Sequence, residues 1–297
     1  MLKIHNLNKS YGDRHVLQDL TLNVINGEIY GLLGANGSGK TTTINIICNL
    51  LKADSGNIQL NNQVISESTK KLIGIAPQEN LLYKTLTCEE NLQFFAEIYG
   101  LSKKNIQKQI KEILAAVNLS DRAKSPVETL SGGMQRRLNI AVALVHQPKL
   151  VILDEPTTGL DIEARYEIWE LIRQLKSQGI TVLLTTHLLD EAERLCAKIG
   201  ILKNGRILVE GSLTELRNLI PAQEVLLLKT PQEKEAIARA QIYGFTHRYY
   251  DRELAFWLPE SLELKEIISR FEGINIDAIS RQPVRLEHIY LELTQQV

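Results

Sequence analysis

Apolar and polar positions alternate along the first part of the chain or give way to short apolar runs, and turn signals separate the segments. Residues 2–11 and 17–34 are rich in aliphatic and β-branched residues, and Gly-Asp and Asn-Gly pairs punctuate them. These patterns predict strands. Residues 40–51 predict a helix, and residues 56–62 and 71–78 predict further strands.

From about Thr87 the apolar positions recur at helical spacing. Residues 88–100 and 102–119 are predicted helices. A third helix follows residue 133 and ends before Pro148. The apolar faces of the second and third helices comprise Ile106, Ile110, Ile113, Leu114 and Val117, and Met134, Leu138, Ala141, Val142 and Val145. We therefore expect a helical insertion over residues 87–147.

The strand pattern returns after the insertion. Residues 149–153 and 180–186 are continuous apolar runs, as expected of buried parallel strands. An amphipathic helix over 163–179, a helix over 188–196 and a strand pair over 198–211 complete this part. Strands alternating with helices predict an α/β domain with a mainly parallel core sheet.

Pro221 marks the predicted boundary between a domain of residues 1–220 and a C-terminal unit of residues 221–297. The C-terminal unit has the order strand, helix, hairpin, helix, strand, with a terminal helix beyond it. That order is compatible with a small ferredoxin-like α+β unit. A packing or dimer-stabilising role is favoured over a regulatory one, since strand packing explains most of its aromatic residues.

Composition narrows the class of protein. The 297 residues carry a net charge of −1, which argues against bulk nucleic-acid binding. Three dispersed cysteines fit a reducing cytoplasm, and no signal peptide is expected. No apolar run approaches the ~18 residues needed to span a bilayer. Any work on a membrane would therefore require a separate membrane subunit.

Residues 34–41, GANGSGKT, match the phosphate-binding pattern G-x-x-x-x-G-K-[ST] between a strand and a helix. The three glycines allow backbone N–H groups to surround a polyphosphate. Lys40 places a charge on the outer phosphates, and the Thr41 hydroxyl can ligate Mg²⁺. A chance glycine-rich turn is the plain alternative. A dinucleotide-binding Rossmann site is excluded, because there is no G-x-G-x-x-G.

Polar residues at predicted strand ends supply further chemistry. Asp154 is placed to hold Mg²⁺, and Glu155 to act as general base toward the attacking water. The alternative is an acidic pair that caps a strand. His187 can hydrogen-bond a γ-phosphate, Gln78 can reach Mg²⁺ or the water, and Tyr11 can stack on an adenine ring. Without the phosphate loop, these three would be structural or surface residues.

A second helix start, in residues 130–137 (LSGGMQRR, the signature segment), also has the character of an anion site. Ser131 can cap the helix, and Gly132 and Gly133 allow backbone N–H groups to approach an anion.

With these motifs in this order, residues 2–215 resemble the ATP-binding subunits of ABC transporters. The resemblance rests on Tyr11 (aromatic loop), residues 34–41 (Walker A), Gln78 (Q-loop), the signature segment, residues 150–155 (Walker B with the following Glu), residues 159–161 (D-loop) and His187 (switch His).

The resemblance implies a P-loop NTPase core with a helical subdomain, and two subunits arranged head to tail around two ATP molecules. ATP would be bound by Tyr11, Gly34, Ala35, Asn36, Gly37, Ser38, Gly39, Lys40, Thr41 and Thr42. Thr41, Gln78 and Asp154 would hold Mg²⁺, and Glu155 and His187 would be catalytic. Ser131, Gly132, Gly133 and Asp161 would act across the dimer interface.

Shorter matches, in residues 85–101 and 285–294, resemble ATPases of ABC-2 type exporters of drugs, polysaccharides or lipids. They imply a separate ABC-2 permease, a second ATP-binding subunit (the same or a different chain) and a place on the inner face of the cell membrane. Two alternatives remain open. One is a non-transport ABC ATPase acting on ribosomes or DNA, and the other is a nucleotide-switch binding module with negligible turnover.

Overall fold

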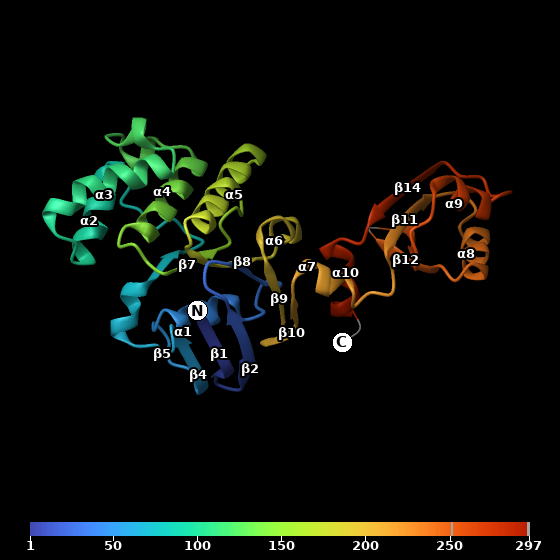
Figure 1. Cartoon of the computed structure of the whole chain (residues 1–297), viewed down its shortest axis with the longest axis horizontal. Coiled ribbons are helices and arrows are strands. Elements are labelled where there is room, and N and C mark those ends of the chain that lie inside the picture. The colour runs from blue at the N-terminus through green and yellow to red at the C-terminus, as the bar shows by residue number, and fades with distance from the viewer. Residues whose placement is uncertain (251, 296–297) are drawn as a thin grey trace. The chain divides into compact units, whose positions relative to one another are not determined.

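The computed structural model describes residues 1–250 and 252–295 (Figure 1), and the chain divides into two compact units, Met1–Ser212 and Leu213–Val297. The division lies eight residues before the predicted boundary of 220/221. The reason is helix α7, Leu213–Arg217, which contacts the last helix of the second unit, α10 (Leu286–Gln295). No helix among the described residues is long and apolar enough to cross a bilayer.

The central sheet of the first unit has six strands in the order β10-β9-β3-β8-β7-β6. Every pairing in it is parallel except the β9–β10 hairpin. This confirms the predicted α/β class with a mainly parallel core sheet. The strands are β3 (Ile29–Leu33), β6 (Ile73–Ala76), β7 (Leu150–Asp154), β8 (Thr181–Thr186), β9 (Lys198–Lys203) and β10 (Arg206–Gly211).

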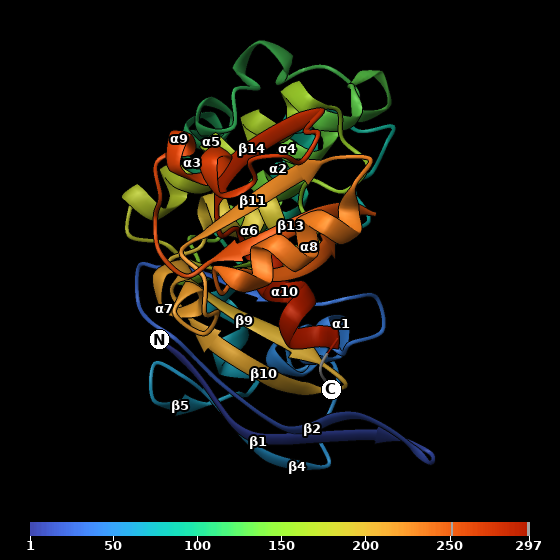
Figure 2. The same cartoon turned by 90° about the vertical axis from the view of Figure 1, so that its right-hand side faces the viewer.

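A separate antiparallel sheet, in the order β2-β1-β4-β5, was not distinguished by the sequence analysis. Its strands are β1 (Leu2–Tyr11), β2 (Arg14–Val24), β4 (Ser55–Leu60) and β5 (Gln63–Val64). The apolar faces of β1 and β2 pack with helix α1 (Lys40–Ile47) and one face of the central sheet in a single core. Figures 1 and 2 show α1 beside this sheet.

The other face of the central sheet packs against helices. Residues Val151, Leu153, Val182 and Leu184 share a core with α2 (Cys88–Ile98), α3 (Lys103–Ala116), α4 (Gly132–Leu144) and α5 (Ile162–Ser177). The apolar face predicted for α3 is buried. Helix α4 differs from its predicted amphipathic form, because nearly all of its residues from Gly133 onward are buried. It lies between the other helices and strands β6 and β7, so it has almost no solvent face.

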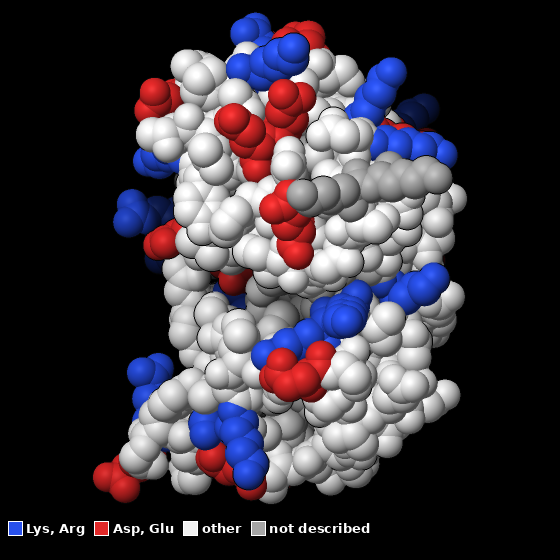
Figure 3. Space-filling view, turned by 90° about the vertical axis from the view of Figure 1, so that its left-hand side faces the viewer, with Lys and Arg blue, Asp and Glu red and all other residues white. Residues whose placement is uncertain are grey.

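Short elements complete the first unit: helix α6 (Leu189–Leu195) and the 3-10 turns η1 (Glu67–Leu72), η2 (Ser120–Arg122) and η3 (Val127–Thr129). On the face of the molecule in Figure 3, Lys and Arg side chains are interspersed with Asp and Glu. That mixture agrees with the net charge of −1.

The second unit is built on a four-stranded antiparallel sheet in the order β12-β13-β11-β14. Its elements follow the order β11 (Glu224–Lys229), α8 (Glu233–Ile242), β12 (Thr246–Tyr250), β13 (Glu253–Leu258), α9 (Leu264–Arg270) and β14 (Ala278–Pro283). Both helices contribute to one core with residues of β11 and β13. This β-α-β-β-α-β order is compatible with a ferredoxin-like unit, which stays a prediction.

Candidate functional site

One cavity of about 480 Å³ in the first unit brings together residues from four separated parts of the sequence. Most of the predicted nucleotide-binding residues line it. The lining comprises Tyr11, Arg14, Val16, Asn36, Gly37, Gly39, Lys40, Thr41, Thr42, Asn45, Gln78 and Glu155. Arg14, Val16 and Asn45 were not among the predicted site residues. The turn at Gly12-Asp13 could have indicated Arg14, since it places Arg14 opposite Tyr11 in the β1–β2 pairing.

The phosphate loop connects strand β3 to helix α1 at the carboxyl end of the central sheet. The Gly34 N–H donates to the Thr186 carbonyl at the end of β8, 3.3 Å away, which fixes the start of the loop. Gly37 and Gly39 have φ angles of +80° and +114°, which favour glycine. A Cβ on Gly39 would lie 2.7 Å from Leu17 Cδ2, so this position also lacks room for a side chain.

Lys40 opens helix α1 and is almost completely buried, with its ammonium group turned back over the loop. Its Nζ donates to the Gly34 carbonyl at 2.7 Å and lies 3.3 Å from Glu155 Oε1. A buried charge needs a partner, and here a carbonyl and a carboxylate supply it. A polyphosphate that enters the loop would therefore compete with Glu155 for Lys40.

Four polar side chains surround the Glu155 carboxylate. Besides Lys40 on Oε1, His187 Nδ1 lies 3.1 Å from Oε2, and the Thr158 hydroxyl and Gln78 Nε2 donate to the same oxygen at 3.2 and 3.3 Å. Burial alone raises the pKa of Glu155. The hydrogen bond with His187 and the charge of Lys40 outweigh it, so the net pKa of Glu155 lies below its ordinary value. At neutral pH this group is a carboxylate.

The backbone of Glu155 is left-handed, with a φ of +46°. Most of the other non-glycine residues with a positive φ are asparagines, which tolerate this region. For a glutamate the conformation costs about 1–3 kcal/mol and persists only where the surroundings enforce it. It follows directly on strand β7, so it turns the chain just after Asp154.

The oxygen atoms near the loop suit a hard cation. The Thr185 hydroxyl donates to Asp154 Oδ1 at 2.5 Å, and Asp154 is otherwise enclosed at the end of β7. Gln78 donates a hydrogen bond from its side-chain amide nitrogen to Glu155, so its side-chain carbonyl oxygen is available for a ligand. The Thr41 side chain is exposed in the cavity. A hydroxyl, an amide and a carboxylate, with substrate phosphates, form the kind of oxygen set that Mg²⁺ accepts.

Among the described residues, the cavity lining includes none of the four residues predicted to act across an interface. Ser131 is the N-cap of α4 and accepts a hydrogen bond from the Met134 N–H at 3.3 Å. Asp161 is the N-cap of α5 and accepts from the Ala164 N–H at 2.8 Å. Both therefore have a structural role in their own chain. Ser131 and Gly132 are exposed, whereas Gly133 is buried.

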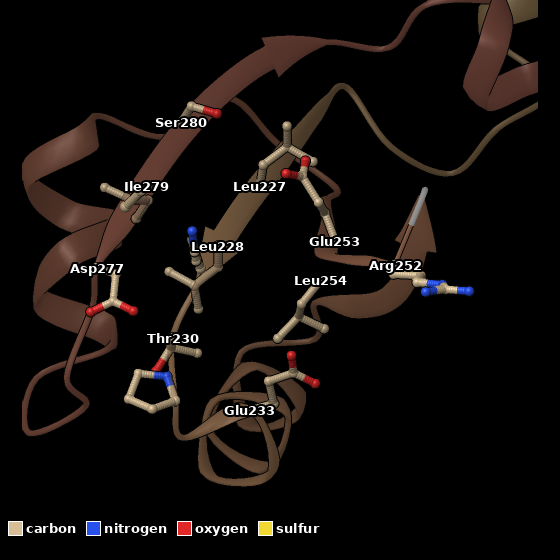
Figure 4. Close-up of a pocket in the computed structure, with 13 residues that line it drawn as sticks. Leu227, Leu228, Thr230, Glu233, Arg252, Glu253, Leu254, Asp277, Ile279 and Ser280 are labelled. Carbon is tan, nitrogen blue, oxygen red and sulfur yellow. The ribbon is translucent and has the colours of Figure 1, made fainter.

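A second cavity, of about 440 Å³, lies in the C-terminal unit (Figure 4). The end of β11 and the starts of β13, β14 and α8 enclose it. Its lining mixes leucines with acidic and basic side chains, and none of the predicted site residues contributes to it.

Comparison with known proteins shows which family the first unit resembles. The family described as ABC transporter matches residues 17–158. The linearmycin resistance ATP-binding protein LnrL of Bacillus subtilis is 38% identical over 306 residues, which cover 99% of this chain and 98% of that protein. The Nod factor export ATP-binding protein I of Sinorhizobium fredii is 35% identical, and the alignment covers 99% of this chain and 85% of that protein. These similarities include the C-terminal unit.

Solved structures agree. The structure of an ATP-binding subunit of an ABC transporter has a TM-score of 0.67 and 35% identity, covering 74% of this chain and 92% of that chain. A dimeric structure of a post-hydrolysis state of an ATP-binding cassette, bound to ADP and Pi, has a TM-score of 0.64 and 30% identity. It covers 71% of this chain and 98% of that chain.

Proposed function

Since the chain belongs to the ABC transporter family and is an ATP-binding subunit with the ATPase fold, we propose that it hydrolyses ATP in a dimer to drive export through a separate membrane permease. The observation that carries the proposal is the contact between Lys40 and Glu155 inside the phosphate-loop cavity. It joins the group that binds phosphate to the group that activates water.

In this mechanism the ATP phosphates enter the loop and draw the Lys40 ammonium group to themselves. Glu155 then keeps His187, Thr158 and Gln78 as partners and orients the attacking water as general base. Mg²⁺ would be held by Thr41, Asp154 and Gln78, where it would neutralise charge on the phosphates. Tyr11, at the rim of the cavity and half exposed, offers its ring to the adenine.

The second half of each site comes from another subunit. The exposed Ser131 and Gly132 at the start of α4 are free to face the nucleotide of a partner, as the neighbouring dimeric cassette structures suggest. Asp161 would lie at the same interface. A homodimer is the simplest assembly, and a heterodimer with a similar subunit fits the same geometry.

The permease is proposed to be of ABC-2 type, in line with the names of the relatives, which concern linearmycin resistance and Nod factor export. A site for it is the apolar surface that follows Gln78. There Tyr83 and Phe94 form an edge-to-face pair with ring centroids 4.8 Å apart, and both rings and Ile98 are exposed. Docking at this surface would hold the chain at the inner face of the cell membrane.

The deciding experiment uses Glu155→Gln. Removal of the base is expected to lower kcat by about 100-fold or more while ATP binding persists. ATP should then convert the variant from monomer to dimer in gel filtration, because the closed state is no longer hydrolysed. Hydrolysis at the wild-type rate by Glu155→Gln would refute the assignment of the base. Co-purification of the wild type with ribosomes or DNA, and not with a polytopic membrane protein, would refute export.

A further inference from the structure

Arg136, in the second turn of the signature helix α4, is almost completely buried. No carboxylate lies within ion-pair distance of it in the described chain. Its guanidinium donates instead to backbone carbonyls and, at 3.5 Å, to Asn80 Oδ1. Burial lowers the pKa of Arg136 to about 10, and the more distant Asp154 and Glu191 offset part of that effect. The group therefore stays charged at neutral pH. Burial of a charge is costly, and the hydrogen bonds of the Arg136 guanidinium offset that cost.

Two of these bonds bracket Glu155. Arg136 Nη2 donates to the Asp154 carbonyl at 2.7 Å, and Nε donates to the Pro156 carbonyl at 2.8 Å. These carbonyls belong to the residues immediately before and after Glu155. One rigid guanidinium plane thus fixes both flanks of the residue with the left-handed backbone.

A third set of bonds reaches the Q-loop. Arg136 Nη1 donates to the Pro77 carbonyl at 2.5 Å and to the Gln78 carbonyl at 3.1 Å. Gln78 in turn donates from its side chain to Glu155 at 3.3 Å. The same guanidinium therefore holds the backbone of Gln78 and the backbone around Glu155 in one frame.

We propose that Arg136 is a positioning residue for hydrolysis: it holds the turn at Glu155 in its strained conformation and fixes Gln78 beside it. This inference rests on the proposed role of Glu155 as general base. It implies that kcat depends on Arg136, whereas ATP affinity, which depends on the phosphate loop, does not.

The test compares Arg136→Met, Arg136→Lys and the neighbouring Arg137→Met. Arg137 is also buried on α4, but its guanidinium does not contact the Glu155 turn. Its Nη1 donates to the Val117 and Asn118 carbonyls at the end of α3, and its Nη2 lies 3.5 Å from Glu167 Oε2 on α5. Arg137→Met therefore controls for loss of a buried guanidinium from the same helix. Arg136→Lys keeps the charge, but a single ammonium group cannot span the two carbonyls that bracket Glu155.

The measurements are kcat, the Kd of ATP for the monomer and the thermal midpoint of the full chain. Arg136→Met is expected to lower kcat by about 30-fold or more with the Kd of ATP changed less than threefold. Arg136→Lys should recover part of the rate. Arg137→Met should lower the thermal midpoint, and its kcat should fall less than that of Arg136→Met. If Arg136→Met fails to fold, the kcat and Kd of Arg136→Lys decide: a lower kcat at unchanged Kd supports the proposal.

Two results would overturn the inference. One is a wild-type kcat in the folded Arg136→Met or Arg136→Lys variant. The other is a parallel loss of kcat, ATP affinity and thermal midpoint that Arg137→Met reproduces. The proposed function has a separate test, because Glu155→Gln can be inactive and form an ATP-dependent dimer whatever Arg136 does.

Discussion

At the residue scale, the site is organised around one carboxylate. Glu155 gathers Lys40 from the phosphate loop, Gln78 from the end of β6 and His187 from the end of β8. The proposed base pairs with the phosphate-binding lysine. A buried charge needs a partner, and each of these two groups supplies the other's.

His187→Ala tests how the carboxylate is held. The hydrogen bond from His187 lowers the pKa of Glu155, so its removal should raise that pKa. The carboxylate would then take up a proton at a higher pH than in the wild type, and the acid limb of kcat/KM would move to higher pH. A ¹³C carboxyl titration of the nucleotide-free protein measures the pKa directly. An unchanged Glu155 pKa in His187→Ala would show that the 3.1 Å contact with His187 does not lower that pKa.

The sequence predicts these residues as site residues because each lies in or beside a contiguous motif or at the end of a predicted strand. It missed Arg14 and Arg136 for different physical reasons. Arg14 reaches the cavity only through the pairing of β1 with β2. Arg136 looks like a surface arginine at a helical position, and its burial depends on carbonyls that lie about 20 and 60 residues away in sequence.

At the element scale, helix α4 shows where periodicity alone fails. Its apolar face was predicted correctly, yet its remaining positions are also buried, because α5 and the central sheet cover them. Gly74 on β6 illustrates how close the packing is: a Cβ there would lie 2.0 Å from the Ala143 carbonyl oxygen. A polar residue in this helix therefore contacts backbone rather than water. The separate antiparallel sheet was missed for a similar reason, since alternation predicts a strand but not its neighbours.

The two glycines at the start of α4 should behave differently when replaced by alanine. A Cβ on Gly133 would lie 2.7 Å from Ala164 Cβ, whereas a Cβ on Gly132 meets nothing within 4 Å. Gly133→Ala is thus expected to lower the free energy of unfolding by about 1–3 kcal/mol, because α4 is pushed away from α5. Gly132→Ala should leave it within about 0.5 kcal/mol. Urea unfolding of the monomers measures both values.

The same pair of variants separates folding from assembly. In the Glu155→Gln background, Gly132→Ala should weaken ATP-dependent dimer formation, because the added methyl group stands on the exposed surface proposed to meet the partner's nucleotide. If Gly132→Ala dimerises with ATP as well as its parent does, that surface does not contact the nucleotide.

At the scale of the whole molecule, the chain combines an ATPase unit with a C-terminal unit that its exporter relatives share. The order of motifs predicted the class of the first unit, and the two-chain active site stays a prediction. It could not place the boundary at residue 212, because the α7–α10 contact joins segments about 70 residues apart. Nor does any motif in the C-terminal unit indicate a ligand for its cavity.

The proposed two-chain site predicts a complementation between variants that a single-chain site would not show. Ser131→Arg should bind ATP as a monomer but fail to dimerise or hydrolyse, while Lys40→Ala should fail to bind the phosphates. In a mixed dimer, one site combines Lys40 of the Ser131→Arg chain with Ser131 of the Lys40→Ala chain, and both residues are intact. When the two variants are mixed in equal amounts, about half of all dimers are mixed, and each mixed dimer has one intact site out of two. Hydrolysis should therefore recover to at most about a quarter of the wild-type rate. Mixing two inactive variants and measuring phosphate release tests this. If mixed dimers form and hydrolysis does not recover, the site is not composed of Lys40 from one chain and Ser131 from the other.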